Sequence, residues 1–250
     1  AISCARHYVR LGVKKKNIVM VDSNGILTKT RLESGELNEY KAEFVRNIPD
    51  GGISEAMVGS DVFLGLSKGG LVSPEMVKSM ADRPLIFALA NPDPEILPED
   101  VMSVRDDAII ATGRSDYPNQ INNVLGFPYI FRGALDVRAT RITEGMKMAA
   151  TKAIAELARE TVPDDVLSAY DGEQIQFGPE YIIPKPFDAR VLIWEASAVA
   201  AAAVEEGVAG VSSKDFSYEG YREELEARLG LTRSIMRRVI NQAKRDKKRI

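Results

Sequence analysis

The sequence has 250 residues, of which 45% are hydrophobic and 28% are charged, a composition typical of a folded globular protein. The net charge of −3 argues against nucleic acid or an anionic membrane as the main partner. No apolar run reaches the roughly 20 residues of a membrane helix, and a single cysteine, Cys4, favours a reducing compartment. We therefore expect a cytoplasmic protein without a signal peptide, and a fragment of a longer chain because it opens inside an expected helix.

Short apolar runs alternate with helix signals through the first half of the chain. Amphipathic spacing predicts a helix over residues 2–11 that closes at Gly12, and a β-branched run over 18–21 ends at Asp22 before a turn. Further strands are expected at 61–66, 84–90 and 108–112, with helices beginning at Ser54, Ser73 and Pro98. This alternation predicts βαβ units and an α/β fold with a doubly wound, Rossmann-like parallel sheet.

The second half of the sequence is helical in pattern. Apolar positions from Met146 to Ala158 keep the spacing of one buried helix face, and an alanine-rich helix is expected from Arg190 to about Glu206. An extended connector at 182–186 separates the two, since proline disfavours helix at the preceding residue. Residues 231–250 combine one apolar stripe with many lysines and arginines, which is a solvated helix face or, alternatively, a nucleic-acid patch.

Two segments have the spacing of a dinucleotide site. In Rossmann units an acidic residue closes the second strand about 20 residues after the start of a glycine-rich turn. Asp22 fits that position and would place the turn at or before Ala1, although Asp22 could also simply form a turn. A second glycine-rich segment, residues 65–70, contains Ser67, Lys68 and Gly69; its backbone could approach a ligand, or it could be a plain strand-to-helix turn.

Seven strings, taken in order, resemble malic enzymes, especially the bacterial type with a phosphotransacetylase-like C-terminal domain. They are Val-Asp-Ser at 21–23, Tyr-Lys-Ala-Glu-Phe at 40–44, Asp-Val-Phe-Leu-Gly-Leu-Ser at 61–67, Ala-Asn-Pro-Asp-Pro-Glu at 90–95, Ala-Thr-Gly-Arg-Ser-Asp-Tyr-Pro-Asn-Gln-Ile-Asn-Asn at 111–123, Phe-Pro-Tyr-Ile-Phe-Arg-Gly-Ala-Leu-Asp at 127–136 and Ile-Pro-Lys-Pro-Phe-Asp at 183–188. The resemblance covers residues 1 to about 210.

The resemblance implies oxidative decarboxylation of (S)-malate to pyruvate and carbon dioxide, with hydride passing to NADP or NAD. It also implies Mg²⁺ or Mn²⁺ in the complete enzyme, because hard cations prefer oxygen ligands. The family's catalytic lysine and tyrosine and its metal-binding carboxylates are expected upstream of Ala1. We therefore expect neither catalytic nor metal-binding residues in this chain, and no turnover from it alone.

Three asparagines match family positions that contact the ligands. Asn91 matches a position that touches both cofactor and malate, while Asn122 matches a cofactor contact and Asn123 a malate contact. An amide can donate to a carboxylate and accept from the nicotinamide carboxamide without adding charge. Taken singly, each asparagine could instead cap a turn. We expect all three at the carboxyl ends of parallel strands, where ligands bind in open α/β sheets.

Cofactor choice is expected to depend on the residues that follow the Asp22 strand. Ser23 and Lys41 match positions that favour a 2′-phosphate, so the resemblance implies NADP, with NAD as the alternative. The alternative for Lys41 is a solvated surface side chain. His7 falls within the first expected helix rather than at a strand end, which disfavours a histidine-based dehydrogenase mechanism in this segment.

The resemblance also implies the organisation of the complete protein. We expect an NAD(P)-binding domain at 1–210 that lacks its first strand and glycine loop, and a helical linker at 211–250. The absent partners are an N-terminal malic domain and a C-terminal phosphotransacetylase-like domain, in a homo-oligomer that binds neither nucleic acid nor membrane. Two alternatives stay open, a cofactor domain of the amino-acid dehydrogenase type and a non-catalytic interaction module.

Overall fold

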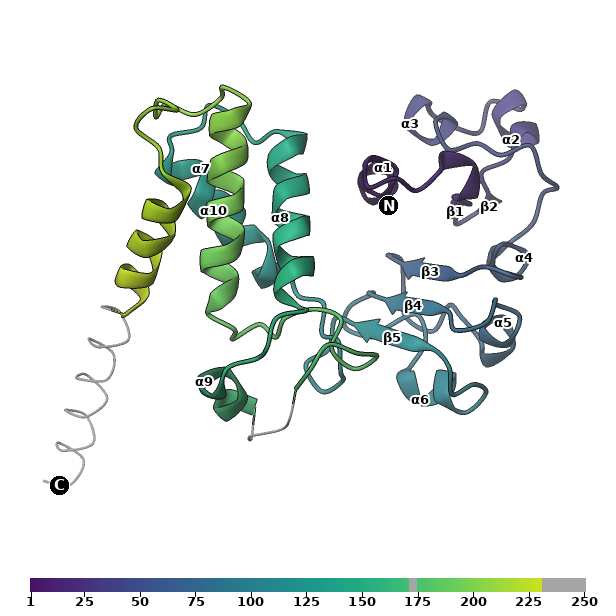
Figure 1. Cartoon of the computed structure of the whole chain (residues 1–250). Helices are drawn as coiled ribbons and strands as arrows, with labels where there is room; N and C mark the ends of the chain where they lie inside the picture. Colours follow the sequence, from purple (N-terminus) through teal and green to yellow (C-terminus); the bar gives the residue numbers. More distant parts are fainter. Residues whose placement is uncertain (171–174, 231–250) are drawn as a thin grey trace, which may run out of the picture. The chain divides into compact units, whose positions relative to one another are not determined.

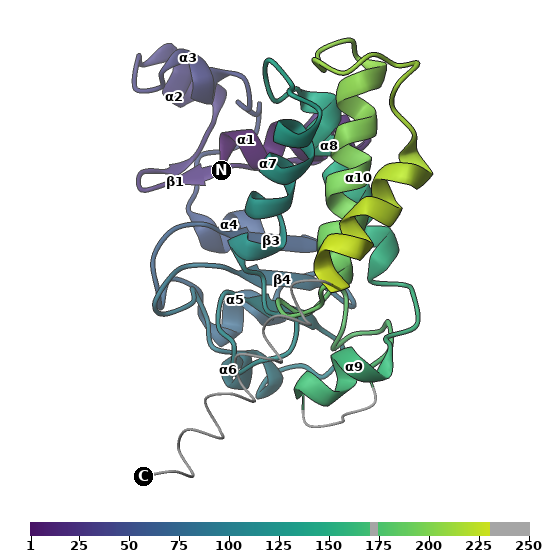
Figure 2. The ribbon, with the colours of Figure 1, turned by 90° about the vertical axis from the view of Figure 1, so that its left-hand side faces the viewer.

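The computed structural model describes residues 1–170 and 175–230, and their contacts form two compact units (Figures 1 and 2). Unit 1 comprises Ala1–Asn122 and Phe177–Ile183, and unit 2 comprises the described residues of Asn123–Gln176 and of the chain from Pro184 onward. Buried Asn119 explains why the short return segment belongs to unit 1. Its side-chain amide donates to Pro179 O at 2.7 Å, and its Oδ1 accepts from Ile182 N at 2.9 Å.

Unit 1 contains short elements joined by turns. In chain order they are α1 (Ile2–Arg10), the 3-10 helix η1 (Lys15–Asn17), β1 (Val21–Asp22), β2 (Gly25–Ile26), α2 (Lys29–Glu33), α3 (Glu39–Ala42), α4 (Ile53–Met57), β3 (Val62–Gly65), α5 (Pro74–Lys78), β4 (Leu85–Ala88), α6 (Pro98–Met102) and β5 (Ile109–Thr112). The helix start predicted at Ser73 is confirmed, since the Ser73 side chain caps α5 by accepting from Met76 N. Pro98 likewise lies in the first turn of α6.

The central sheet of unit 1 is parallel, as the sequence pattern predicts. Its strand order is β3-β4-β5, with Gly65 opposite Ala88 and Ala88 opposite Thr112 at the carboxyl ends. Ile86 and Ala88 of β4 are fully buried in a cluster with apolar side chains of α4, α5 and α6, so these three helices cover one face. The Rossmann-like fold class is therefore confirmed, and the strand ends that should bind ligands lie together (Figure 1).

The N-terminal strand differs from its prediction. Val21 and Asp22 pair antiparallel with Ile26 and Gly25 in a two-residue hairpin, instead of joining the parallel sheet. The turn at Ser23-Asn24 reverses the chain, and Gly25 has a φ of 114°, which glycine adopts without steric strain. Leu27 N then donates to Met20 O at 2.9 Å and continues the hairpin. The expectation of a parallel strand over 18–21 is wrong in its pairing, although the turn was predicted correctly.

Unit 2 is helical. Its elements are η2 (Asn123–Leu125), α7 (Phe127–Asp136), α8 (Glu144–Leu157), α9 (Asp164–Leu167), η3 (Ser168–Tyr170) and α10 (Arg190–Glu205), and residues 218–230 are also helical. The helices predicted at 146–158 and 190–206 are confirmed as α8 and α10. The basic stretch 231–250, whose role the sequence left open, lies outside the described residues.

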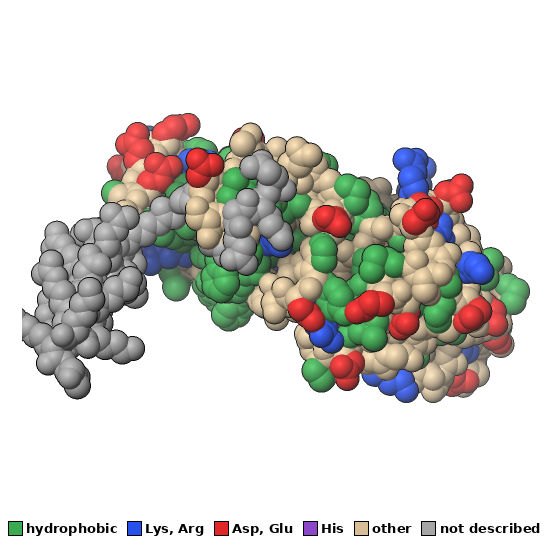
Figure 3. Space-filling model, turned by 90° about the horizontal axis from the view of Figure 1, so that it is seen from below, with side chains coloured by type: hydrophobic (Ala, Val, Ile, Leu, Met, Phe, Trp, Pro, Cys, Tyr) green, Lys and Arg blue, Asp and Glu red, His purple; other side chains and the backbone are tan. Residues whose placement is uncertain are grey.

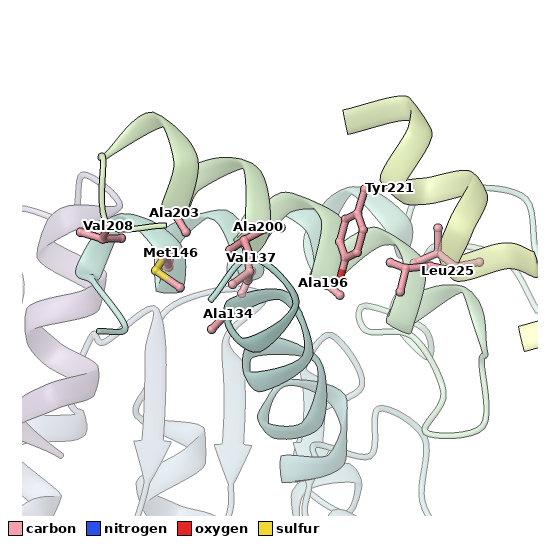
Figure 4. Close-up of a cluster of buried hydrophobic side chains, with 12 residues drawn as sticks. Ala134, Val137, Met146, Ala196, Ala200, Ala203, Val208, Tyr221 and Leu225 are labelled. Carbon is pink, nitrogen blue, oxygen red and sulfur yellow. The ribbon is translucent and has the colours of Figure 1, made fainter. Parts of the chain in front are cut away.

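Small side chains allow α7, α8 and α10 to pack closely (Figure 4). Ala196, Ala200 and Ala203 of α10 are fully buried against Ala134 and Val137 of the α7 region and Met146 of α8. Tyr221 and Leu225, from the helical segment 218–230, complete the same cluster. The alanine-rich composition that the sequence shows in α10 is thus explained by close helix packing.

No helix in the described part of the chain is both long and apolar enough to span a membrane. On the face of the molecule drawn in Figure 3, acidic and basic side chains are interspersed on the right-hand part, which is unit 1. The described side chains of unit 1 thus present both charge signs on this face.

Candidate functional site

A cavity of about 580 Å³ lies at the carboxyl ends of β3 and β4, within unit 1. Two loops form its walls, the glycine-rich loop that follows β3 and the turn that follows β4. Its lining residues are Ser67, Lys68, Gly69, Gly70, Asn91, Pro92, Asp93, Pro94, Leu97 and Asp100. The cavity thus joins four of the residues expected at the site from sequence, namely Ser67, Lys68, Gly69 and Asn91.

The glycine-rich loop passes close to the turn because its glycines have no side chains. A Cβ atom on Gly69 would lie 2.8 Å from the Cβ atom of Asp93, which is closer than side chains pack. Gly70 has a φ of 66° and donates from its backbone N to Pro94 O at 3.0 Å. A larger residue at Gly69 would therefore push the two walls apart, whereas one at Gly70 would be strained by the positive φ.

The buried side chain of Glu95 connects the two walls of the cavity. Its Oε1 accepts from Ser67 N at 2.9 Å and its Oε2 accepts from Ala90 N at 3.0 Å. The side chain is fully buried, and a Cβ atom on Gly65 would lie 2.6 Å from each carboxylate oxygen. Sequence reasoning gave Glu95 no role, because a charged residue in a proline-rich turn is usually exposed.

Asn91 lies over the end of the neighbouring strand. A Cβ atom on Gly113, the residue after β5, would lie 3.0 Å from Asn91 Oδ1 and 3.2 Å from Nδ2. The Asn91 side chain is therefore held between the end of β5 and the cavity that it lines. Its amide brings an NH₂ donor group and an acceptor oxygen to the rim of the sheet, which suits a ligand with both carboxylate and carboxamide groups.

The paired asparagines follow a segment that returns to the end of β5. Thr112 and Gln120 form a parallel bridge, and Ile121 N donates to Thr112 O at 2.8 Å. Asn122 is the next residue and ends that part of unit 1, while Asn123 begins η2 and belongs to unit 2. Asn122 thus lies beyond the carboxyl end of a parallel strand, as expected.

Asp22 forms a small charged network with two basic side chains. Arg31 donates to Asp22 Oδ1 at 3.0 Å and to Oδ2 at 3.3 Å, and Lys41 Nζ donates to Oδ2 at 2.6 Å. Desolvation alone would raise the pKa of Asp22, but the hydrogen bonds from Arg31 and Lys41 outweigh it and hold that pKa well below its usual range. Asp22 is therefore a carboxylate throughout the neutral range.

These contacts leave Asp22 with little capacity for a further donor. A carboxylate has about four lone-pair sites, and Asn24 N takes one more of them at 2.9 Å. Arg31, which also donates to the carbonyls of Gly25 and Ile26, is only 8% exposed, so it is fixed in place. Lys41 is the more exposed of the two basic partners, and Ser23, the next residue after Asp22, is exposed with its hydroxyl donating to Asn24 Oδ1 at 3.4 Å. The sequence gave no sign of Arg31, which lies on the short helix α2.

Among the described residues, no three histidine, cysteine, aspartate or glutamate side chains gather so that they could hold a metal ion. The polar groups that the structure brings together suit a ligand with phosphate, amide and carboxylate groups instead.

The parallel sheet has a cavity at its carboxyl ends with a glycine-rich loop beside it, and an acidic residue ends the N-terminal strand β1. These features define a dinucleotide-binding α/β domain. Residues 5–169 match the family model described as malic enzyme, NAD binding domain. The chain belongs to the malic enzyme family, which replaces the alternative of an amino-acid dehydrogenase-type domain.

Individual relatives agree with the family match. The chain is 50% identical over 250 residues to an NADP-dependent malic enzyme of Rhizobium meliloti (strain 1021), covering 100% of this chain and 32% of that protein. It is 47% identical to an NAD-dependent malic enzyme of the same organism, covering 98% of this chain and 31% of that one. The crystal structure of Entamoeba histolytica malic enzyme superposes with a TM-score of 0.82 at 35% identity, covering 96% of this chain and 48% of that one. The chain thus spans about a third of the length of these two curated relatives.

Proposed function

We propose that this chain is the cofactor-binding part of a malic enzyme that converts (S)-malate to pyruvate and carbon dioxide. The observation that carries the proposal is the cavity at the carboxyl ends of β3 and β4, which joins the Ser67–Gly70 loop to Asn91 in a chain of this family. In the complete enzyme the nicotinamide cofactor accepts the hydride. The residues of this chain bind and orient the two reactants.

Asn91 is proposed to contact both malate and cofactor. Its Nδ2 group donates to a malate carboxylate, and its Oδ1 accepts from the nicotinamide carboxamide. Because the amide is neutral, it orients the malate carboxylate and the nicotinamide carboxamide without adding a charge to the site. Asn122 is proposed to extend the cofactor contact, and Asn123 to bind malate. The backbone of Ser67, Lys68 and Gly69 is proposed to approach the cofactor where no side chain intervenes.

NADP is proposed as the preferred cofactor, with NAD as the alternative. Arg31 and Lys41 neutralise Asp22, which reduces the repulsion that a free carboxylate would exert on a 2′-phosphate. Ser23 supplies a hydroxyl, and Lys41, whose ammonium keeps further N–H donors beside its bond to Asp22, supplies a cation for that phosphate. The two Rhizobium meliloti relatives are named for different cofactors, one for NADP and one for NAD.

The complete enzyme is proposed to be a cytoplasmic homo-oligomer with an N-terminal malic domain and a phosphotransacetylase-like C-terminal domain. Within the described residues, β3 has a strand on only one side and Val62 is 46% exposed, which supports an additional strand with its glycine loop supplied from upstream. The catalytic residues and the ligands for Mg²⁺ or Mn²⁺ are proposed to lie there too. The domain boundary is proposed near residue 210, with the linker beginning at 211.

The test is malate-dependent reduction of NADP, followed by absorbance at 340 nm, in the full-length protein with Mg²⁺ or Mn²⁺. We expect turnover from the full-length protein, none from the 250-residue chain, and a loss of at least about 100-fold in kcat/KM for malate in Asn91→Ala. Asn47→Ala, an exposed asparagine outside the cavity, is the matched control. Full activity in Asn91→Ala would favour a non-catalytic role for this domain, and an inactive, folded full-length protein would refute the proposal.

A further inference from the structure

The crevice between β3 and β4 opens where their backbone hydrogen bonds end. Gly65 is paired with Ala88, and Leu89 N donates to Gly65 O at 3.2 Å as the last ladder contact. Beyond it the two chains diverge, one into the Ser67–Gly70 loop and the other into the Asn91 turn. The width of the cavity is therefore set by whatever holds these two chains beyond the sheet.

Glu95 supplies that connection with one carboxylate. The amides of Ser67 and Ala90, just beyond the last ladder contact, each donate to a different oxygen of Glu95, at 2.9 and 3.0 Å. The backbone of the same turn adds two more links, since Val72 N donates to Glu95 O at 2.9 Å and Gly70 N to Pro94 O at 3.0 Å. The side chain of Glu95 thus replaces two missing ladder bonds across the crevice.

The surroundings of Glu95 fix it in this position. It is fully buried beside Ile96 and Val72, which belong to the apolar cluster beneath the sheet. Gly65 leaves the space that the carboxylate fills, since a Cβ atom there would lie 2.6 Å from both oxygens. A buried charged acceptor that lost either amide would be left partly unsatisfied, which is costly in an apolar environment.

We infer that Glu95 is a positioning residue for the proposed dinucleotide and malate site. By holding Ser67 and Ala90 at a fixed separation, it sets the distance between the glycine-rich loop and Asn91, and hence the fit of a ligand that touches both. Identifying that ligand rests on the proposed function, whereas the coupling of the two loops rests on the geometry of Glu95 alone.

The substitution Glu95→Gln tests the coupling because it preserves size and removes one acceptor. A glutamine side chain has one oxygen, so its NH₂ group must face either Ser67 N or Ala90 N, and two donors cannot bond to each other. One loop is then released. Gly65→Ala tests the same carboxylate from the opposite side, because the added methyl displaces it without altering its chemistry. Glu33→Gln, an exposed glutamate of unit 1, is the matched control.

The first measurement is amide hydrogen exchange in the 250-residue chain. A lost hydrogen bond to a charged group, worth about 1.5–3 kcal/mol, corresponds to exchange that is roughly 10- to 100-fold faster. We expect this acceleration at Ser67 or Ala90 in Glu95→Gln and at both in Gly65→Ala, with the protected amides of β4 unchanged. Unchanged exchange at Ser67 and Ala90 in both variants would overturn the inference.

The second measurement is steady-state kinetics of the full-length enzyme. We expect the KM values for malate and NADP to rise about tenfold in both variants and to stay unchanged in Glu33→Gln. A purely structural role would lower the amount of folded enzyme, which reduces the apparent kcat and leaves KM unchanged, and that outcome would overturn the positioning role. If the wild-type enzyme does not oxidise malate, the proposed function fails, and the hydrogen-exchange result still decides whether Glu95 couples the loops.

Discussion

Glu195 is a buried acid whose contribution to the stability of this protein should fall as the pH rises. It lies on α10 with no exposed surface, and neither carboxylate oxygen has a hydrogen-bond partner among the described residues. Burial raises the pKa of Glu195 from its ordinary value of 4.5 to about 9. Nearby Tyr129 is affected as well: burial and then the charges of Glu195 and Asp188 raise its pKa.

The sign and size of the effect follow from proton linkage. Between pH 4.5 and about 9 the folded chain keeps a proton on Glu195 that the unfolded chain has released. The contribution of Glu195 to the free energy of unfolding is therefore highest below pH 4.5 and falls as the pH rises toward 9. At roughly 1.36 kcal/mol per pH unit, the loss between about pH 5 and pH 8 is about 4 kcal/mol, a large share of the stability of most domains.

Urea unfolding of wild type and Glu195→Gln at pH 5 and at pH 8 measures this loss. Trp194, the only tryptophan of the chain, is next to Glu195 and reports the unfolding of unit 2 by fluorescence. Glutamine does not titrate, so its buried amide adds only a constant offset, and other groups cancel between the two proteins. We expect the variant to gain about 4 kcal/mol over wild type when the pH is raised from about 5 to about 8.

Glu205→Gln, an exposed glutamate at the end of the same helix, should leave the pH profile unchanged. Parallel pH profiles for wild type and Glu195→Gln would show that Glu195 is ionised in the folded protein or finds a partner there. Either result would refute the reasoning from burial.

Three further predictions concern the site and its support. Gly113→Ala places a methyl group within 3.0 Å of Asn91 Oδ1, so in the full-length enzyme we expect the KM for malate to rise about tenfold with an unchanged circular dichroism spectrum. Lys41→Ala removes the cation proposed for the 2′-phosphate. We expect kcat/KM for NADP to fall roughly 10- to 100-fold while kcat/KM for NAD changes little. An equal loss with both cofactors would contradict this role. Gly133→Ala adds a Cβ atom 2.9 Å from the Val199 Cβ atom between α7 and α10. The free energy of unfolding, measured in urea by Trp194 fluorescence, should therefore fall by about 1–3 kcal/mol. Wild-type stability of the variant would show that the helices can separate without loss.

Much of the fold could be predicted from the sequence because the signals were local. Ser73-Pro74-Glu75 predicts a capped helix start, and the apolar runs over 84–90 and 108–112 predict the buried strands β4 and β5. The apolar spacing from Met146 to Ala158 predicts the buried face of α8, of which Met146, Ala150, Ala153 and Leu157 are buried in the helix. Each of these patterns lies within one element, so propensity and periodicity suffice.

The parts that sequence reasoning missed depend on residues distant in the chain. The antiparallel pairing of residues 21–22 was decided by the turn at Ser23-Asn24, with the positive φ of Gly25 after it, and not by the strand's own residues. Helix α7 received no prediction although Pro128 lies in its first turn, and Gly133, which permits its contact with α10, gave no sign of that role in the sequence. Arg31 becomes important only through Asp22, and no periodic pattern connects the two.

The candidate site gives every polar residue of Asn-Pro-Asp-Pro-Glu at 91–95 a structural role. Its three polar residues each lie against a glycine from another part of the sheet: Asn91 against Gly113, Asp93 against Gly69 and Glu95 against Gly65. Alternate residues of the turn thus fold back over three strand-end or loop glycines, and the intervening prolines restrict the backbone between them. A side chain at any of the three glycines would displace the polar residue that faces it. The string and the glycines therefore act as one unit, and a substitution in either should disturb the cavity at the same place.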